Sequence, residues 1–433
     1  MRLATDHKRT SVLEERLGRA WHDAWVSRPG NSGNTVAEKL LEVKAVKRHY
    51  MALLLVGVLI GALIGAACAP EAAPPAEEEE GKPVEEPEEE EEEAAPAQPD
   101  GKVYKWDLQS VWPAGFQSHV ECDKIIQRIN AASGGRLEIT LHPGGSIVPA
   151  YEILDAVDSG ALDGEVSGIS AQFGKFATAM FFDKYPAGPN AYESYVWLYH
   201  GGGLELWQEL YDMNNINVHV IGVIGASQAE NFGWFNEPIT SLDDFNGLKF
   251  RTQGTWGDVL TSLGASVVTM PGGEVYESAQ RGVIDAFEYS TPAVDKSAGF
   301  PEIRNVMMEP GIHAPTALYD LIVNQNSWDE LPPDLQELVN LGAQAGAIYV
   351  LAATDYADGI AYQELVDEGI EVGRLPDDVI EEIVIISNEF WDDMAEDDPF
   401  FGEVLKSQRD FLRGFRAMQD LKQPDPALLD WPQ

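Results

Sequence analysis

Cysteine is almost absent from this chain of 433 residues, which contains only Cys68 and Cys122. The first follows an apolar N-terminal run and the second lies in a predicted helix between 116 and 132. Two cysteines in regions with such different roles cannot form a disulfide framework that organises the fold. Cys122 is most simply a small, buried, apolar residue.

Basic residues are also scarce, with 29 Lys and Arg against 72 Asp and Glu and a formal net charge of −43. A surface this negative repels phosphate backbones, so nucleic acid is excluded as a partner. The acidic excess is explained most simply by solubility in a saline medium.

Signatures of catalysis are missing as well. The segment His200-Gly201-Gly202-Gly203 resembles the oxyanion loop of esterases, but no Gly-x-Ser-x-Gly elbow supplies a nucleophile. The glycine-rich segment 271–277 lacks the Lys and Ser/Thr of a phosphate loop, and no zinc-protease, Walker or EF-hand pattern occurs. These absences favour a binding protein over an enzyme.

The N-terminal region carries a targeting signal. Residues 43–68 combine a basic segment, an apolar run from 51 to 67 and small residues before Cys68. This pattern predicts a lipoprotein signal with the lipid on Cys68, and hence an extracytoplasmic, lipid-anchored protein. The alternative is an uncleaved anchor, although the run is at the lower limit for spanning. Residues 1–42 are interpreted as an extension from a start site assigned too far upstream.

Residues 69–102 are rich in Glu and Pro and almost free of large apolar side chains. Such a segment cannot bury enough surface to offset the entropy of ordering it. It is predicted to be a disordered, acidic tether.

The rest of the chain alternates predicted strands and helices, which indicates an α/β fold. Two similar passages, at 153–164 and 276–288, each run from a helix through Gly into a short strand with Asp, as expected of two equivalent units. We predict a first α/β lobe at 103–225, a second at 226–312, and return strands with C-terminal helices at 313–433. Those helices could close the second lobe or pair two subunits as a homodimer.

Four stretches carry a family resemblance: YHGGGLELWQELY, ENFGWFNEPITSLDDFNGLKFRTQG, LGASVVTMPGGEVYESAQRGVIDAFEY and EPGIHAP. They resemble the solute-binding subunits of tripartite ATP-independent periplasmic (TRAP) transporters, nearest the subclass for 2-oxo and 2-hydroxy monocarboxylates. The resemblance runs in order from about Trp106 to Phe411. It implies a two-lobed venus-flytrap fold that closes on a small organic acid and delivers it to TRAP membrane subunits.

The resemblance also implies that Arg251, at the end of the GLKFR stretch, grips the carboxylate of the acid. A guanidinium presents a planar pair of donors that matches a carboxylate and stays charged when buried. A structural salt bridge is the alternative role for Arg251.

In the resembled subclass a metal ion bridges ligand and protein. Its ligands correspond here to Glu230, to Glu288 with Tyr289, and to Ala314, where the family has a Glu. One carboxylate is therefore lost and one gained, and the resemblance implies Ca²⁺ or Na⁺ in a rearranged cage. Alternatively, Glu230 hydrogen-bonds a ligand hydroxyl and no metal is present.

Aromatic residues are predicted to line the ligand cleft, since such pockets are mostly apolar with a few polar groups. Trp112 and Trp234 are the stronger candidates, followed by Tyr289 and Tyr185, and Asn190 is a candidate polar contact. Two rival functions remain open: a sensor that presents the acid to a membrane receptor, and an extracytoplasmic enzyme that acts on it.

Overall fold

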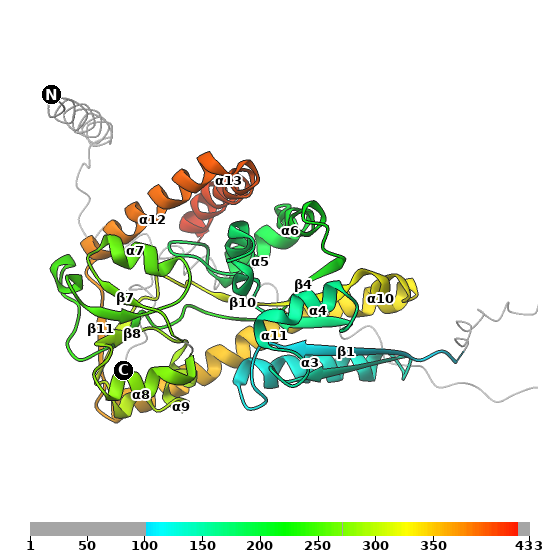
Figure 1. Cartoon of the computed structure of the whole chain (residues 1–433), viewed down its shortest axis with the longest axis horizontal. Helices are drawn as coiled ribbons and strands as arrows, with labels where there is room; N and C mark the ends of the chain where they lie inside the picture. The colour runs from blue at the N-terminus through cyan, green and yellow to red at the C-terminus, as the bar shows by residue number, and fades with distance from the viewer. Residues whose placement is uncertain (1–100, 271, 423–433) are drawn as a thin grey trace, which may run out of the picture. The chain divides into compact units, whose positions relative to one another are not determined.

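The computed structural model describes residues 101–270 and 272–422, which fold around two β-sheets (Figure 1). The predictions for the start extension, the signal segment with Cys68 and the tether up to residue 100 lie outside the described residues. The two sheets are the centres of the two lobes that the sequence predicts.

The first sheet has five strands in the order β2-β1-β3-β10-β4. Its strands are β1 (Tyr104–Ser110), β2 (Leu137–His142), β3 (Gly164–Ser167), β4 (Val218–Ser227) and β10 (Ala317–Asn324). The pairs β1–β2 and β1–β3 are parallel, whereas β10 runs antiparallel to β3 and β4. Although β4 lies at the edge of this sheet, it is almost wholly buried and rich in Val and Ile, as expected of a strand covered on both faces.

Helices cover both faces of this sheet. They are α3 (Gln117–Ala132), α4 (Ile153–Asp158), α5 (Ala191–His200), α6 (Gly203–Met213) and α10 (Gln325–Asp329). On α3, Cys122, Ile125, Ile126 and Ile129 are buried at the spacing of one helix face, as the sequence predicts.

The second sheet has six strands in the order β11-β9-β5-β8-β6-β7. They are β5 (Gly233–Phe235), β6 (Lys249–Arg251), β7 (Ser266–Val268), β8 (Ala286–Phe287), β9 (Val306–Glu309) and β11 (Glu371–Arg374). Its short helices are α7 (Trp256–Ser262), α8 (Val275–Gln280) and α9 (Pro292–Ser297).

Three long C-terminal helices complete the described chain: α11 (Pro333–Asp367), α12 (Asp377–Asp397) and α13 (Pro399–Lys422). Helix α11 packs on β4 and α3 of the first lobe and on α9 of the second. Helix α12 packs on α7, and α13 packs on α5 and α6. The chain also passes between the sheets at residues 228–232, after β4, and at 310–316, before β10.

Asn190 has a structural role that differs from the ligand contact predicted for it. Its side chain accepts a hydrogen bond from the Glu193 backbone N–H at 2.9 Å, and the Glu193 carboxylate accepts one from the Asn190 N–H at 3.0 Å. This reciprocal cap begins α5 by satisfying donors that the first turn leaves unpaired. Asn190 is exposed and lies outside the cleft described below, so local helix capping replaces the predicted ligand contact.

Two acidic side chains are buried in the first sheet, Glu165 on β3 and Asp320 on β10, each 1% exposed. One Asp320 oxygen accepts a hydrogen bond from the Ser167 N–H at 2.7 Å. Burial raises the pKa of Glu165 from 4.5 to about 7, while the charge of Lys175 opposes the shift. Burial, together with the charge of Glu165, also raises the pKa of Asp320.

A carboxyl group whose pKa is raised by folding binds more protons in the folded state. The free energy of unfolding should therefore fall as pH rises from about 4.5 to 7, by roughly 2–3 kcal/mol for Glu165 alone. Urea unfolding between pH 4.5 and 7.5 should show this slope, and Glu165→Gln should flatten it. The exposed control Glu138→Gln should keep it. If the free energies of unfolding of wild type and Glu165→Gln change with pH in parallel, the raised pKa is wrongly assigned to Glu165.

Candidate ligand and cation site

The candidate site is a cleft of about 440 Å³ between the lobes. Among the residues that line it are ones from the carboxyl ends of β6 and β8, from the two crossings at 228–232 and 310–316, and from first-lobe segments at 111–112, 168–173 and 183–186. Ligands of α/β proteins bind at the carboxyl ends of strands, where loops diverge. The fold thus places side chains from both lobes and from the connections around one space.

The two crossings are held against each other by backbone contacts. The Glu230 N–H donates to the Ala314 carbonyl at 3.0 Å and joins the two crossings, while the Ala187 N–H of the first lobe donates to the Ile312 carbonyl at 2.9 Å. A Cβ atom on Gly311 would lie 1.7 Å from the Glu230 carbonyl oxygen, so only Gly fits there. This close approach brings Glu230 and His313 side by side.

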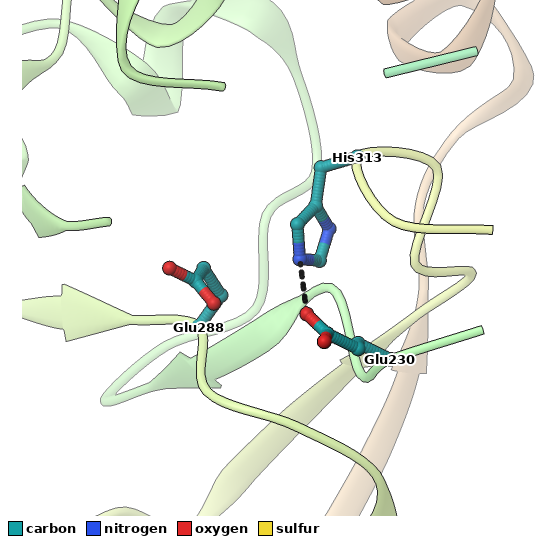
Figure 2. A group of neighbouring side chains, drawn as sticks. All are labelled: Glu230, Glu288 and His313. Atoms are coloured by element: carbon teal, nitrogen blue, oxygen red, sulfur yellow. Dashed lines mark ion pairs between the residues drawn. The ribbon is translucent and has the colours of Figure 1, made fainter. Parts of the chain in front are cut away.

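Glu230, Glu288 and His313 form a buried cluster of potential metal donors. One donor atom from each residue lies within 4.8 Å of the other two. Figure 2 shows the Glu230 carboxylate facing the imidazole, with Glu288 approaching from a separate segment. The His313 Nε2 atom is 3.5 Å from a Glu230 oxygen, too long for a good hydrogen bond. Neither His313 ring nitrogen has a hydrogen-bond partner among the described residues.

Lys184 supplies a positive charge to this cluster from the first lobe. Its ammonium group forms an ion pair with the Glu230 oxygen Oε1, and its side chain is 30% exposed whereas that of Glu230 is 6% exposed. Burial by itself would raise the pKa of Glu230. The charge of Lys184 and the contacts of His313 and Lys184 outweigh it and hold that pKa at about 2. Glu230 is therefore an anion across the neutral range.

Arg251 lines the cleft as the resemblance implies, and it is 4% exposed. Its Nη1 donates to the Glu288 carbonyl at 3.0 Å and to the Glu288 carboxylate at 3.3 Å. Its Nε and Nη2 donate to the Met270 carbonyl at 3.2 and 2.9 Å. A bidentate grip on a ligand carboxylate requires some of these donors to turn into the cleft.

Aromatic side chains form part of the cleft wall, and Trp112, Tyr185 and Tyr289 are among them. The Trp112 ring packs edge-on against Tyr319, with centroids 4.8 Å apart. The Tyr289 ring packs against Phe300, with centroids 5.0 Å apart. Each ring has a neighbour that fixes its orientation, so the wall is formed before a ligand arrives.

Trp234 belongs to the core of the second lobe and does not line the cleft. It is fully buried, and its indole N–H donates to the buried Asp295 carboxylate at 2.8 Å. Asn231 donates to the same oxygen at 2.7 Å. Side chains alternate along a strand, and on β5 the alternation turns Trp234 toward the core. The predicted ligand contact is replaced by this internal bond.

The donors present fit a metal ion. Two carboxylates and an imidazole with unpartnered nitrogens converge from three segments of the chain, in a buried setting beside a cleft open to a ligand. The sequence pointed to Glu230 and Glu288 but missed His313 and Lys184. His313 lies next to Ala314, the position that drew attention in the Ile312-His313-Ala314-Pro315 motif, and nothing in the local sequence marks Lys184.

Among the helices within 101–422, none is both long enough and apolar enough to cross a membrane.

Comparisons with known proteins agree on the family. Residues 108–398 match the family described as bacterial extracellular solute-binding protein, family 7 (DctP). A monocarboxylate 2-oxoacid-binding periplasmic protein of Nostoc sp. is 30% identical over 309 residues, which are 71% of this chain and 84% of the relative.

Two solved structures are also similar. A TRAP periplasmic solute-binding protein from Colwellia psychrerythraea, with bound calcium and pyruvate, is 32% identical with a TM-score of 0.71, covering 76% of this chain and 99% of its own. Another from Pseudoalteromonas atlantica, with bound sodium and pyruvate, is 30% identical with a TM-score of 0.70. The match covers 77% of this chain and 100% of the other. The chain belongs to the DctP family of bacterial extracellular solute-binding proteins and is of the TRAP periplasmic type.

Proposed function

We propose that this protein captures a short 2-oxo monocarboxylate together with a metal cation and delivers the acid to a TRAP membrane transporter, without a catalytic step. The observation that carries the proposal is the convergence of Glu230, Glu288 and His313 beside Arg251 in the cleft. Support comes from the pyruvate and metal ion in the two similar structures and from the 2-oxoacid-binding relative.

The physical basis of capture is charge placement. Arg251 and Lys184 supply positive charge, and Glu230 and Glu288 supply negative charge that a cation can neutralise. A carboxylate that enters the cleft gains charge-assisted hydrogen bonds from Arg251, and its 2-oxo oxygen can join the metal's coordination shell. Closure of the two lobes about the acid would bury these interactions and strengthen them.

Calorimetric titration of the purified full chain with pyruvate tests this function. Loss of a charged hydrogen-bond donor should weaken pyruvate binding by about 100-fold in Arg251→Gln. Prior treatment with a chelator should reduce binding further, because the cation bridges acid and protein. Asn190→Ala and Trp234→Phe are controls that should lower thermal stability but keep pyruvate affinity. Wild-type affinity in Arg251→Gln would contradict the assigned anchor.

We further propose that Cys68 carries a lipid that holds the protein at the membrane. The support is the basic and apolar pattern of residues 43–68 and the extracellular character of the family. Mass spectrometry of the membrane-extracted protein should find Cys68 as the first residue, with an added acyl-glyceryl mass. Cys68→Ser should retain the preceding residues. A wild-type mass that includes residues 51–67 would instead show an uncleaved anchor.

A homodimer through α11 is a proposal about assembly. This helix is apolar on its buried face and also carries exposed apolar side chains, namely Leu341, Ile348, Tyr349, Tyr356, Ile360, Tyr362 and Val366. At 100° per residue these side chains fall on one face. These exposed apolar side chains lie on the half of the helix opposite its buried face, and two copies can cover this surface for each other about a two-fold axis.

Sedimentation of the full chain should therefore show a dimer at micromolar concentration. Tyr356→Glu with Ile360→Glu should shift it to monomer, since two charges would be buried in an apolar interface. Ile385→Glu, at a similarly exposed position on α12, should leave the dimer intact. A monomeric wild type, or a double variant that still dimerises, would rule out this face.

A further inference from the structure

We infer that His313 is the third protein ligand of the cation, and that the site consequently prefers a borderline divalent transition ion, with Zn²⁺ as its type, to Ca²⁺ or Na⁺. The inference rests on the proposed function in one respect, that a cation enters this cluster. It goes beyond that function by assigning the ligand and the class of metal.

The imidazole of His313 is the first feature that points to a metal ligand. His313 is 5% exposed, and neither nitrogen has a hydrogen-bond partner among the described residues. A buried polar group without a partner is energetically costly. The ring packs against Trp256, with centroids 5.5 Å apart, and edge-on against Phe232, at 6.0 Å. These rings fix its plane while Nε2 faces the Glu230 carboxylate (Figure 2).

The two carboxylates of the cluster can offer only a limited number of oxygens to a metal. Lys184 occupies Oε1 of Glu230, so Oε2, the oxygen nearer His313, is the one available to a metal. Arg251 similarly contacts Oε1 of Glu288. Outer partners of this kind orient a metal-binding carboxylate and favour a single-oxygen contact. The cluster therefore supplies two oxygens and one nitrogen.

Three donors of this composition do not match a hard cation. Calcium takes six to eight oxygen ligands, whereas zinc in an open site takes three protein donors and one position for water or ligand. Imidazole suits Zn²⁺, Ni²⁺ and Cu²⁺ better than Ca²⁺. Bonds of about 2 Å space tetrahedral donors about 3.3 Å apart. Small side-chain rotations would close a set that already lies within 4.8 Å.

Position 314 lacks the carboxylate that the resemblance implies. The resemblance implies a metal-binding Glu there, but this chain has Ala314, which is 2% exposed and whose carbonyl accepts the Glu230 N–H. The backbone of the crossing at 310–316 keeps its contact with Glu230, but it carries no carboxylate at position 314. The carboxylate lost at 314 is matched by the one gained at Glu230, and His313 of the same crossing adds a nitrogen donor to the cluster.

Lys184 and Arg251 repel every cation that approaches, and the repulsion scales with the charge of the ion, so Zn²⁺ and Ca²⁺ are repelled equally. A transition ion gains in addition the strength of its bond to imidazole nitrogen, which does not depend on net charge alone. The preference between the two divalent ions therefore comes from His313.

The test is calorimetric titration of the full chain, freed of metal by dialysis against a chelator, with ZnCl₂, CaCl₂ and NaCl separately and without any acid. We expect Zn²⁺ to bind at least about 100-fold more tightly than Ca²⁺. Co²⁺, as a spectroscopic substitute, should give the strong visible absorption of a four-coordinate ion.

His313→Asn replaces the nitrogen donor with an oxygen donor of similar size. It should weaken Zn²⁺ binding at least about 100-fold while Ca²⁺ affinity is kept or gained. His142→Asn, which changes a surface histidine paired with Asp107, is the matched control and should bind Zn²⁺ as wild type does. The wild-type ranking of metals tests the inference even if His313→Asn does not fold.

The inference is overturned if Ca²⁺ or Na⁺ binds wild type more tightly than Zn²⁺, or if folded His313→Asn keeps its Zn²⁺ affinity. Its failure is distinct from failure of the proposed function. If pyruvate binding requires Ca²⁺ and is unchanged in His313→Asn, the inference is wrong but the proposed function stands. If Zn²⁺ binding is lost in His313→Asn and no 2-oxo acid binds the protein, the inference is supported but the proposed function is wrong.

Discussion

The hydrogen bond between the two crossings, from the Glu230 N–H to the Ala314 carbonyl, is the contact on which the site depends. Each crossing connects one sheet to the other, so neither has a strand partner of its own at this point. Their mutual bond satisfies polar backbone that would otherwise be buried and unpaired. The close fit of Gly311 against the Glu230 carbonyl fixes their spacing. A carboxylate and an imidazole that are 83 residues apart in sequence are thereby brought into contact at the junction of the lobes.

The charged groups of the cleft are arranged around that junction as two pairs, Lys184 with Glu230 and Arg251 with Glu288. Buried ions are tolerated when each has an opposite partner, and removal of one partner leaves an uncompensated charge. The pairing keeps four ionised side chains in place before any ligand is present. Lys184 comes from the first lobe and Arg251 from the second, so the site is assembled only when both lobes are folded.

The long helices complete this arrangement mechanically. Because α11 packs on β4 and α3 of the first lobe and on α9 of the second, the lobes are not joined by the two crossings alone. The exposed apolar side chains of α11 are not among the residues that line the cleft.

Much of the architecture could be predicted from the sequence, because the spacing of hydrophobic residues and the glycines that end helices are local features. The alternation along 101–433 predicted an α/β fold, and the family motifs identified Arg251, Glu230, Glu288 and Tyr289 as residues that line the cleft. Asn190 and Trp234 were misassigned, since a helix cap and a core-facing strand residue look the same in sequence as polar and aromatic pocket groups. Only the tertiary structure decided that His313 and Lys184 join Glu230, because the contact depends on how two distant crossings and a first-lobe segment meet. Local pattern thus determines which elements form, whereas long-range backbone pairing determines which side chains share one charge environment.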